Sequence, residues 1–152
     1  MGRVLLTGMS GVGKSTVIAE LTARGVLAVD TDDGQWKTAS GEWDLHAVRG
    51  LLDAHADIVV AGTVDNQGMV YDLFDHIVLL AAPTSVMIER VMQRTDNPYG
   101  SSAEEREEIL EYTRSVEPLL RATATEEIDT TQPLDRTVEQ IEHLLSTPRR
   151  FT

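Results

Sequence analysis

The sequence predicts an α/β protein built around a parallel sheet, and three observations carry that prediction. Short apolar runs of strand length alternate with segments of helical periodicity, which is typical of βαβ units. A glycine-rich turn joins the first apolar run to the first helical segment. The length of 152 residues suits one domain, in which about 70% of the unfolded chain's surface can be buried. We therefore expect a single domain over residues 1–146, with helices on both faces of the sheet.

The first half of the chain alternates strands and helices. Residues 3–7 form an apolar run, and in residues 14–24 the apolar side chains recur at helical spacing. Residues 26–29 form a second apolar run. The same two patterns predict a helix around residues 45–52 and a third strand at 58–61.

The second half of the chain continues the alternation. A fourth strand is predicted at 77–80, followed by a helix for which Thr84 is the expected N-cap. Ser102 and Glu105 match a capping box, which predicts the start of an acidic helix. A short edge strand near Ile128 and an amphipathic helix then complete the domain.

The chain is acidic, with 13 basic against 25 acidic residues and a formal net charge of −12 at pH 7. Nucleic acids and anionic membranes attract basic surfaces, so this balance argues against both as partners. No apolar run approaches the roughly 18 residues of a membrane span, and the N-terminal segment meets a glycine-rich turn too soon for a signal peptide. We expect a cytoplasmic monomer or homodimer whose last residues, 147–152, form a frayed tail.

The glycine-rich turn, Gly8-Met9-Ser10-Gly11-Val12-Gly13-Lys14-Ser15, matches the phosphate-binding pattern G-x-x-x-x-G-K-[ST] at each fixed position. It follows a predicted strand and opens a predicted helix, which is the context that the pattern requires. Glycines let several backbone N–H groups converge on one anion, and the helix N-terminus adds its positive dipole. We expect this loop to hold the phosphates of ATP through Gly8, Ser10, Gly11, Val12, Gly13, Lys14, Ser15 and Thr16.

Two side chains of this loop have expected roles in chemistry. Lys14 would reach the β- and γ-phosphates, and the hydroxyl of Ser15 would bind Mg²⁺. The alternative is a glycine-rich turn that binds nothing, but the motif and its context agree independently. Lys14 and Lys37 are the two lysines of the sequence, so a lysine-rich surface does not account for Lys14.

Carboxylates follow the second predicted strand, at Asp30, Asp32 and Asp33. Ligands of open α/β sheets bind beyond the carboxyl ends of the strands, which is where these side chains are expected. We expect Asp30 or Asp32 to be an outer ligand of Mg²⁺, and Asp32 or Asp33 to act as the base or orienting group for a phosphoryl acceptor. The alternative is that these acids form turns and cap helices.

Arg90 and Arg94 lie four residues apart on the helix after the fourth strand and therefore share a face. Two like charges at this spacing become favourable around an anion, so both are candidates for stabilising the transferring phosphoryl group. The turn-rich segment that follows is of lid-like size, and we expect a lid over about residues 94–102. A solvated basic face is the alternative. Trp36 and Trp43 either line an acceptor pocket or pack the segment between them.

In this order of motifs the chain resembles the P-loop kinases of the nucleoside monophosphate kinase-like group, which includes adenylate, shikimate and gluconate kinases. The resemblance rests on the phosphate loop, on the Asp30-x-Asp32 pair and on Arg90-Val91-Met92-Gln93-Arg94, which looks like the R-x-x-x-R segment before a lid. It implies the three-layer P-loop NTPase fold, with a five-stranded parallel sheet of order 2-3-1-4-5. It also implies an acceptor region at about residues 30–70.

The resemblance further implies how ATP is held away from the phosphate loop. In such kinases the first arginine packs on adenine and the second touches phosphate, which are the implied roles of Arg90 and Arg94. The segment 130–133 lies where these kinases wrap adenine with backbone, and this makes Thr131 and Pro133 implied contacts. The residues after the third strand, 62–67, match neither shikimate nor gluconate kinases, so the acceptor does not carry over from either.

The charge pattern favours a hydroxyl acceptor. A nucleoside monophosphate brings its own phosphate, which arginines usually hold in bidentate pairs. Between Ser15 and Ile77 the basic residues are Arg24, Lys37 and Arg49, against several aspartates. We therefore expect an ATP-dependent kinase for a sugar, polyol or nucleoside, with nucleoside monophosphate kinase as the alternative.

A nucleotide-dependent switch or ATPase is the alternative from another class. Guanine-specific switches rely on an Asn-Lys-x-Asp element, and mechanical ATPases usually carry an apolar strand that ends in Asp-Glu. The sequence contains neither.

Replacing the loop lysine tests the phosphate-loop assignment. We expect Lys14→Ala to abolish ATP binding, because the loop loses its cation, and to leave the fold intact. Calorimetry with ATP and a circular dichroism spectrum measure the two effects. Undiminished nucleotide affinity in this variant would exclude the assignment.

Overall fold

The computed structural model describes residues 2–9, 11–32, 34–93 and 102–146. Across these residues, parallel strands form one five-stranded sheet in the order β2-β3-β1-β4-β5, which confirms the expected fold and strand order. The strands are β1 (Arg3–Thr7), β2 (Ala28–Asp30), β3 (Ile58–Ala61), β4 (His76–Ala81) and β5 (Glu126–Asp129). The second strand begins two residues later and ends one residue later than the pattern predicts, so Asp30 belongs to the strand itself.

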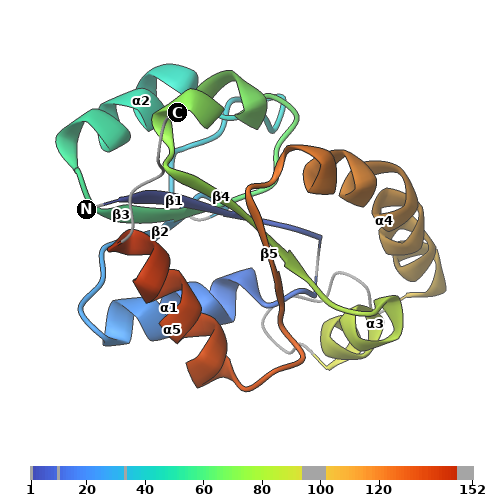
Figure 1. Ribbon diagram of the computed structural model, residues 1–152. Helices are drawn as coiled ribbons and strands as arrows, with labels where there is room; N and C mark the ends of the chain where they lie inside the picture. Colours follow the sequence, from blue (N-terminus) through green and yellow to red (C-terminus); the bar gives the residue numbers. More distant parts are fainter. Residues whose placement is uncertain (1, 10, 33, 94–101, 147–152) are drawn as a thin grey trace.

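Helices cover both faces of this sheet (Figure 1). They are α1 (Lys14–Ala23), α2 (Leu45–Ala54), the 3₁₀ helix η1 (Gln67–Leu73), α3 (Thr84–Met92), α4 (Ala103–Thr123) and α5 (Leu134–Leu145). Figure 1 shows α2 and η1 on one face and α1 and α5 on the other. Helices α3 and α4 pack against each other on the side of the sheet where β4 ends.

The core has two parts because side chains of a strand alternate between the faces of the sheet. Val4 and Leu6 of the central strand β1 pack in the cluster that includes α1 and α5 residues. Leu5 points the other way, into the cluster with α2 and η1. All three are fully buried, as expected for a parallel sheet that is covered on both faces.

The structure confirms one of the two predicted helix N-caps and corrects the other. The hydroxyl of Ser102 accepts the N–H of Glu105 at 3.1 Å, which confirms the predicted cap of α4. Thr84 is not the N-cap of α3; that prediction is wrong. Pro83 takes the cap position in an extended conformation, and its carbonyl accepts the N–H of Met87 at 3.1 Å, so Thr84 is already helical.

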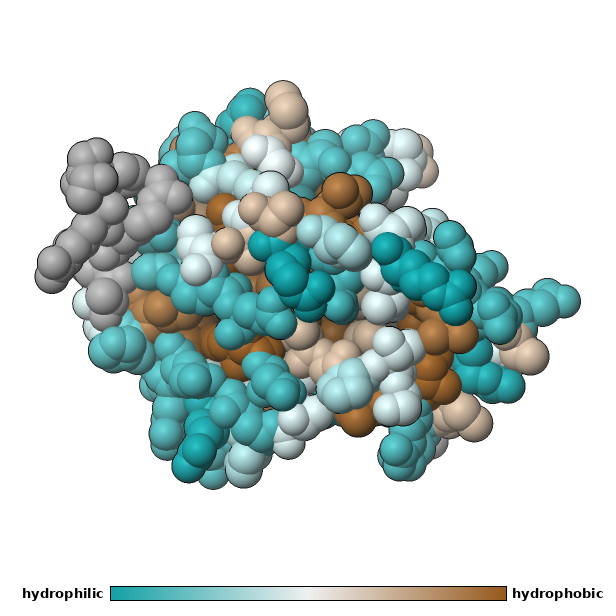
Figure 2. Space-filling view, turned by 45° about the vertical axis from the view of Figure 1, so that its right-hand side comes forward, coloured by the Kyte–Doolittle hydropathy of each residue, from teal (hydrophilic) through white to brown (hydrophobic). Residues whose placement is uncertain are grey.

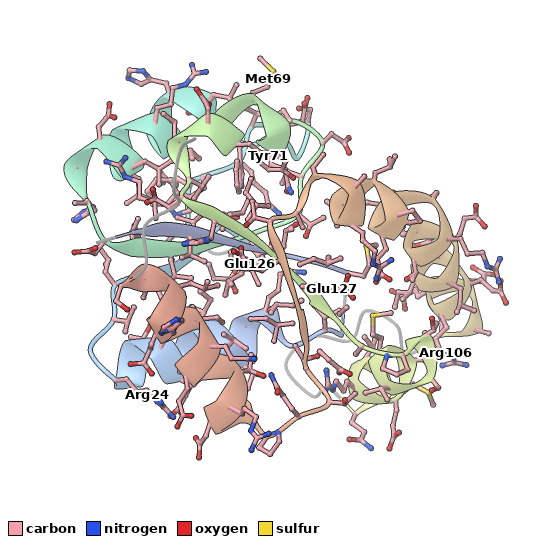
Figure 3. All side chains as sticks on the ribbon, in the orientation of Figure 1. Arg24, Met69, Tyr71, Arg106, Glu126 and Glu127 are labelled. Atoms are coloured by element: carbon pink, nitrogen blue, oxygen red, sulfur yellow. The ribbon has the colours of Figure 1, made fainter. Side chains whose placement is uncertain are left out.

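Arg24 joins the two helices on one face of the sheet. Its guanidinium contacts Glu20 of α1 at 3.1 Å, and Asp135 and Glu142 of α5 at 3.0 and 2.9 Å. The hydrogen bond to Glu20, and then the one to Glu142, raise the pKa of Arg24 above its usual value. Figure 3 shows Arg24 at the surface, and its three partners are partly or largely exposed, so these ion pairs link α1 with α5 but add little stability.

The visible surface is mostly hydrophilic, with apolar side chains exposed in places (Figure 2). The large exposed apolar side chains are Leu27, Met69, Met92, Tyr112, Leu119 and Leu134. Among the described residues, no helix is both long enough and apolar enough to cross a membrane.

Truncation of a core side chain in α5 tests the packing of this face. Ile141 is fully buried, and we expect Ile141→Ala to lower the free energy of unfolding by about 2–5 kcal/mol, because the lost methyl groups leave a cavity. Urea denaturation measures the difference. Met92→Ala is the control, because Met92 is 56% exposed and its truncation should change stability by no more than about 0.5 kcal/mol. Equal effects of the two changes would contradict the assigned core.

Candidate active site

The phosphate loop runs from β1 to α1 through backbone conformations that favour glycine. Gly8, Gly11 and Gly13 all have positive φ angles, of 154°, 88° and 100°. A Cβ on Gly8 would lie 2.5 Å from the carbonyl oxygen of Leu80, and one on Gly11 would lie 2.5 Å from that of Met87. The loop therefore packs directly on the end of β4 and on α3, at the carboxyl edge of the sheet.

Thr63, two residues after the end of β3, holds the start of this loop in place by hydrogen bonds. Its hydroxyl donates to the carbonyl of Gly8 at 2.6 Å and accepts the N–H of the same residue at 3.1 Å. The hydroxyl of Thr7 lies 3.0 Å from that of Thr63, and the amide of Gln67 donates to Thr7 at 3.1 Å. A chain of hydrogen bonds thus runs from η1 through two threonines to the loop.

Lys14 lies across the mouth of the loop. Its ammonium group donates to the carbonyl of Gly8 and, at 3.4 Å, to that of Met9. The positive charge is therefore held by the loop backbone next to the N-terminus of α1. This is the place where a phosphate would meet both the ammonium and the backbone N–H groups.

Ser15 and Asp30 face each other at the opening of the loop. The hydroxyl of Ser15 donates to Oδ2 of Asp30 at 2.9 Å, and Oδ1 of Asp30 accepts the N–H of Asp32 at 3.0 Å. A hydroxyl and a carboxylate are the hard oxygen donors that Mg²⁺ takes, so the pair fits that ion. Among the described residues, no group of three or more His, Cys, Asp or Glu gathers as a metal site. A nucleotide-bound Mg²⁺ does not need one, because it keeps its phosphate and water ligands.

Trp43 anchors the turn that carries the aspartates. Its indole N–H donates at 3.0 Å to the hydroxyl of buried Thr31, which donates in turn to the carbonyl of Ala61 at 2.7 Å. Asn66 bonds both the N–H and the carbonyl of Trp43 at 3.0 Å. Trp43 is 1% exposed, so of the two interpretations of this residue the packing role holds. Trp36 packs against the same cluster.

Two cavities border the loop. The larger, of about 620 Å³, is lined by Gly8, Met9 and Lys14 from the loop and by Asp32 and Thr63 beside it. The smaller, of about 340 Å³, shares none of its described lining residues with the larger and borders a different part of the loop. Its lining includes Gly11, Val12, Gly13, Thr16, Arg90 and Thr130. The ends of the loop and its middle therefore face two different cavities.

Arg90 links two segments that line the smaller cavity, the phosphate loop and the residues after β5. Its guanidinium donates to the carbonyl of Gly11 at 3.1 Å, and to the hydroxyl and carbonyl of Thr130 at 3.0 and 2.9 Å. Asp129 shapes the same segment by accepting the hydroxyl and the N–H of Thr131 at 2.7 and 2.8 Å. Those bonds lower the pKa of Asp129 below its usual value. Among the described residues Thr130, rather than Thr131 or Pro133, lines this cavity.

Asp32 lies at the edge of the larger cavity, apart from the Ser15–Asp30 pair. Its carboxylate accepts a hydrogen bond from the ammonium of Lys37 at 2.6 Å. The sequence leaves Asp30 and Asp32 as alternatives for the metal ligand, and in the structure their side chains have different partners, Ser15 and Lys37.

Several predicted features lie outside the described residues. These are Ser10, Asp33, Arg94, most of the lid predicted over 94–102 and the tail 147–152. Their roles stay predictions.

The sequence interpretation noted the segment 62–67 beyond the third strand but gave its residues no role in the site, and it missed the wall formed by α4. Thr63, Gln67 and Tyr71 line the larger cavity together with apolar side chains of α4. For Thr63 and Gln67 the position in the sequence was the available signal, because polar residues shortly after a strand lie at the carboxyl edge of the sheet, where ligands bind. The contribution of α4 had no such signal, because it depends on how that helix packs.

Removing the hydroxyl of Thr63 tests whether this residue holds the loop. Thr63→Val removes two hydrogen bonds to Gly8, each contributing about 0.5–1.5 kcal/mol. We expect the affinity for ATP to fall by about 5- to 100-fold in calorimetric titration. Thr63→Ser keeps the hydroxyl and is the matched control, with affinity near that of the original protein. A valine variant that binds ATP as well as the serine variant would refute the role.

Comparison with protein families matches residues 4–111 to the family AAA_18, described as an AAA domain. A curated dephospho-CoA kinase of Deinococcus radiodurans is 32% identical over 95 residues, which are 62% of this chain and 44% of that protein. The chain thus matches less than half the length of this curated relative.

Solved structures share the fold. Shikimate kinase from Acinetobacter baumannii, in complex with shikimate, has a TM-score of 0.69 at 18% identity, over 97% of this chain and 94% of that one. A gluconokinase from Sinorhizobium meliloti has a TM-score of 0.60 at 24% identity, over 95% and 91%. The YorR protein of Bacillus subtilis, in complex with phosphorylated GDP, has a TM-score of 0.66 at 19% identity, over 95% of each chain. At these identities the likeness is one of fold.

The family match and the fold agree with the motifs. The resemblance to P-loop kinases of the nucleoside monophosphate kinase-like group is thereby confirmed at the level of family and fold. Because the family match spans well over half of the sequence, this chain belongs to the AAA domain family AAA_18, on a P-loop fold with a five-stranded parallel sheet.

Proposed function

We propose that the protein is an ATP-dependent phosphotransferase that transfers the γ-phosphoryl group to a hydroxyl of a neutral small molecule. The observation that carries the proposal is the pair of cavities that border different parts of the phosphate loop. A nucleotide in the smaller cavity has its phosphates along the loop, and its terminal phosphate then reaches Lys14 at the edge of the larger cavity. A second molecule in the larger cavity meets that phosphate directly.

The smaller cavity suits the base of ATP. Val12, Val17 and Leu134 give it apolar walls, and the guanidinium of Arg90 offers a flat surface on which a base can stack. Arg90 is bonded to the carbonyl of Gly11 and to Thr130, which supports a role in holding the nucleotide more directly than one at the transferring phosphate. Of the two arginines, Arg94 is therefore the one that we propose to stabilise, together with Lys14, the negative charge of the transition state.

The charge of the larger cavity favours a neutral acceptor. Among its described lining residues Lys14 is the one cation, while Asp32 and Asp65 are anions. Lys14 is committed to the phosphates of ATP, and Lys37 is paired with Asp32 at 2.6 Å. A second phosphate would add negative charge beside two carboxylates, whereas hydroxyl groups can donate to them.

The geometry supports a direct, in-line transfer. The acceptor oxygen bonds to the γ-phosphorus, the bond from that phosphorus to the β,γ-bridging oxygen breaks, and ADP leaves. The hydroxyl proton passes to a carboxylate, for which Asp32 is placed at the cavity edge and Asp33 is the alternative. Lys14 stabilises the charge on the phosphoryl oxygens.

Ser15 and Asp30 are the residues that would hold Mg²⁺. When bound, the ion neutralises and orients the phosphates. The printed names of the similar proteins, dephospho-CoA kinase, shikimate kinase and gluconokinase, support the same class of reaction.

A panel of acceptors tests the proposed reaction. With Mg²⁺ and ATP present, we expect ADP release only when a sugar, polyol or nucleoside is added, because the cavity favours neutral hydroxyl compounds. A coupled assay measures ADP, and mass spectrometry identifies the phosphorylated product. Turnover with nucleoside monophosphates alone would overturn the neutral acceptor. ATP hydrolysis that needs no acceptor and rises with a protein partner would favour a switch.

Two single substitutions identify the base. We expect Asp32→Asn to lower kcat by about 10²- to 10⁴-fold while ATP affinity stays unchanged, because the carboxylate that takes the proton is gone. Asp33→Asn is the matched comparison and should keep most of the turnover. The opposite pattern would give the role to Asp33, and two fully active variants would exclude both carboxylates.

A further inference from the structure

We propose that the molecule bound in the larger cavity is a nucleoside: a hydroxyl-bearing sugar joined to a flat, mostly apolar ring. This inference rests on the proposed function and narrows it, because bare sugars and polyols are no longer expected as good acceptors. It follows from the two unlike walls of the cavity and from their order relative to the phosphate loop.

One wall is apolar and comes from α4. Tyr112, Val116, Leu119 and Leu120 of this helix line the cavity. Tyr112 is 58% exposed and Leu119 is 67% exposed, which is unusual for side chains of this size. These two side chains of α4 line the larger cavity, whereas Leu110 of the same helix lines a different cavity. A sugar or polyol would leave this wall in contact with water, whereas a nucleobase would cover it.

The opposite wall is polar and comes from the segments after β2 and β3. Asp32, Thr63, Asp65 and Gln67 belong to it. Carboxylates recognise hydroxyl groups well, because each oxygen accepts hydrogen bonds and none donates. The sugar of a nucleoside supplies such donors without adding charge.

Tyr71 lies between the two walls, and its hydroxyl is oriented by the protein. Gln67 donates to this hydroxyl at 2.8 Å, donates to Thr7 at 3.1 Å and accepts the N–H of Val64 at 2.9 Å. The amide of Gln67 is thereby committed to the protein, and the phenol of Tyr71 keeps its own proton for a ligand. Figure 3 shows Tyr71 on the side of η1 that faces the sheet, whereas Met69 of the same helix points outward.

The order of the walls fixes the orientation of the ligand. Thr63 of the polar wall is hydrogen-bonded to Gly8 of the loop, and α4 provides the apolar wall. The hydroxyl groups therefore lie toward the terminal phosphate, and the flat ring lies against α4. The volume of about 620 Å³ is in the range of about 300–1000 Å³ that encloses molecules larger than a single sugar.

Direct binding tests the ligand class independently of catalysis. The protein is saturated with Mg²⁺ and a non-hydrolysable ATP analogue, and calorimetry then measures affinities for adenosine, guanosine, cytidine, thymidine, ribose, sorbitol and phenyl β-glucoside. We expect at least one nucleoside to bind at least tenfold more tightly than ribose, sorbitol or the phenyl glucoside. Equal or tighter binding of any of those three compounds would overturn the inference.

Variants of the apolar wall test the placement of the ring. Tyr112→Ser should weaken nucleoside binding by about tenfold, since stacking of one base on an aromatic ring is worth about 1–3 kcal/mol. Leu119→Ser should weaken it as well, because the ring loses an apolar contact. Neither should change the affinity for the ATP analogue. Both side chains are exposed, so the fold should tolerate the changes. Met69→Ser is the matched control, because Met69 is 63% exposed and points away from the cavity. Nucleoside binding that is unaffected by both wall variants would overturn the inference.

The same samples separate this inference from the proposed function. Tight nucleoside binding without ADP release supports the ligand class and overturns the kinase. ADP release with polyols but not with nucleosides supports the kinase and overturns the ligand class.

Discussion

The backbone of Gly8 is the point on which the site depends. Its carbonyl accepts hydrogen bonds from the hydroxyl of Thr63 and the ammonium of Lys14, and its N–H donates to Thr63. No side chain fits there, because a Cβ would meet the carbonyl of Leu80 at 2.5 Å. One residue thus joins the ends of β1 and β3, packs on β4 and holds the cation of the phosphate loop. The conformation of the loop therefore depends on its contacts with the ends of β3 and β4 as well as on its own residues.

Different parts of the phosphate loop line the two cavities of the site. The middle of the loop, at Gly11 and Gly13, faces the smaller cavity with Arg90, and its ends, at Gly8 and Lys14, face the larger one. An acidic protein can hold a polyphosphate in this way, because backbone N–H groups, one ammonium and a metal ion carry the attraction. The net charge of −12 therefore argues against polynucleotide partners but not against ATP.

The sequence predicts what is local and misses what depends on packing. The phosphate loop and the cap at Ser102 are short patterns with a direct backbone cause, and the structure shows the expected conformations. The sequence leaves Asp30 and Asp32 as alternatives for the metal ligand; only the fold pairs Asp30 with Ser15 and places Asp32 at a cavity. The apolar wall of α4 had no signal, because the same side chains on another helix would be part of a core. Thr84 was misassigned because Pro83 can itself cap a helix.

A crystal structure of the protein with Mg²⁺, a non-hydrolysable ATP analogue and a nucleoside tests the central claim most directly. The account predicts the adenine beside Arg90 and Thr130, the metal between Ser15 and the phosphates, and a nucleoside hydroxyl beside Asp32. That hydroxyl should lie about 3–3.5 Å from the γ-phosphorus, as a reacting pair requires. Adenine bound in the larger cavity, or a terminal phosphate that points away from it, would contradict the account.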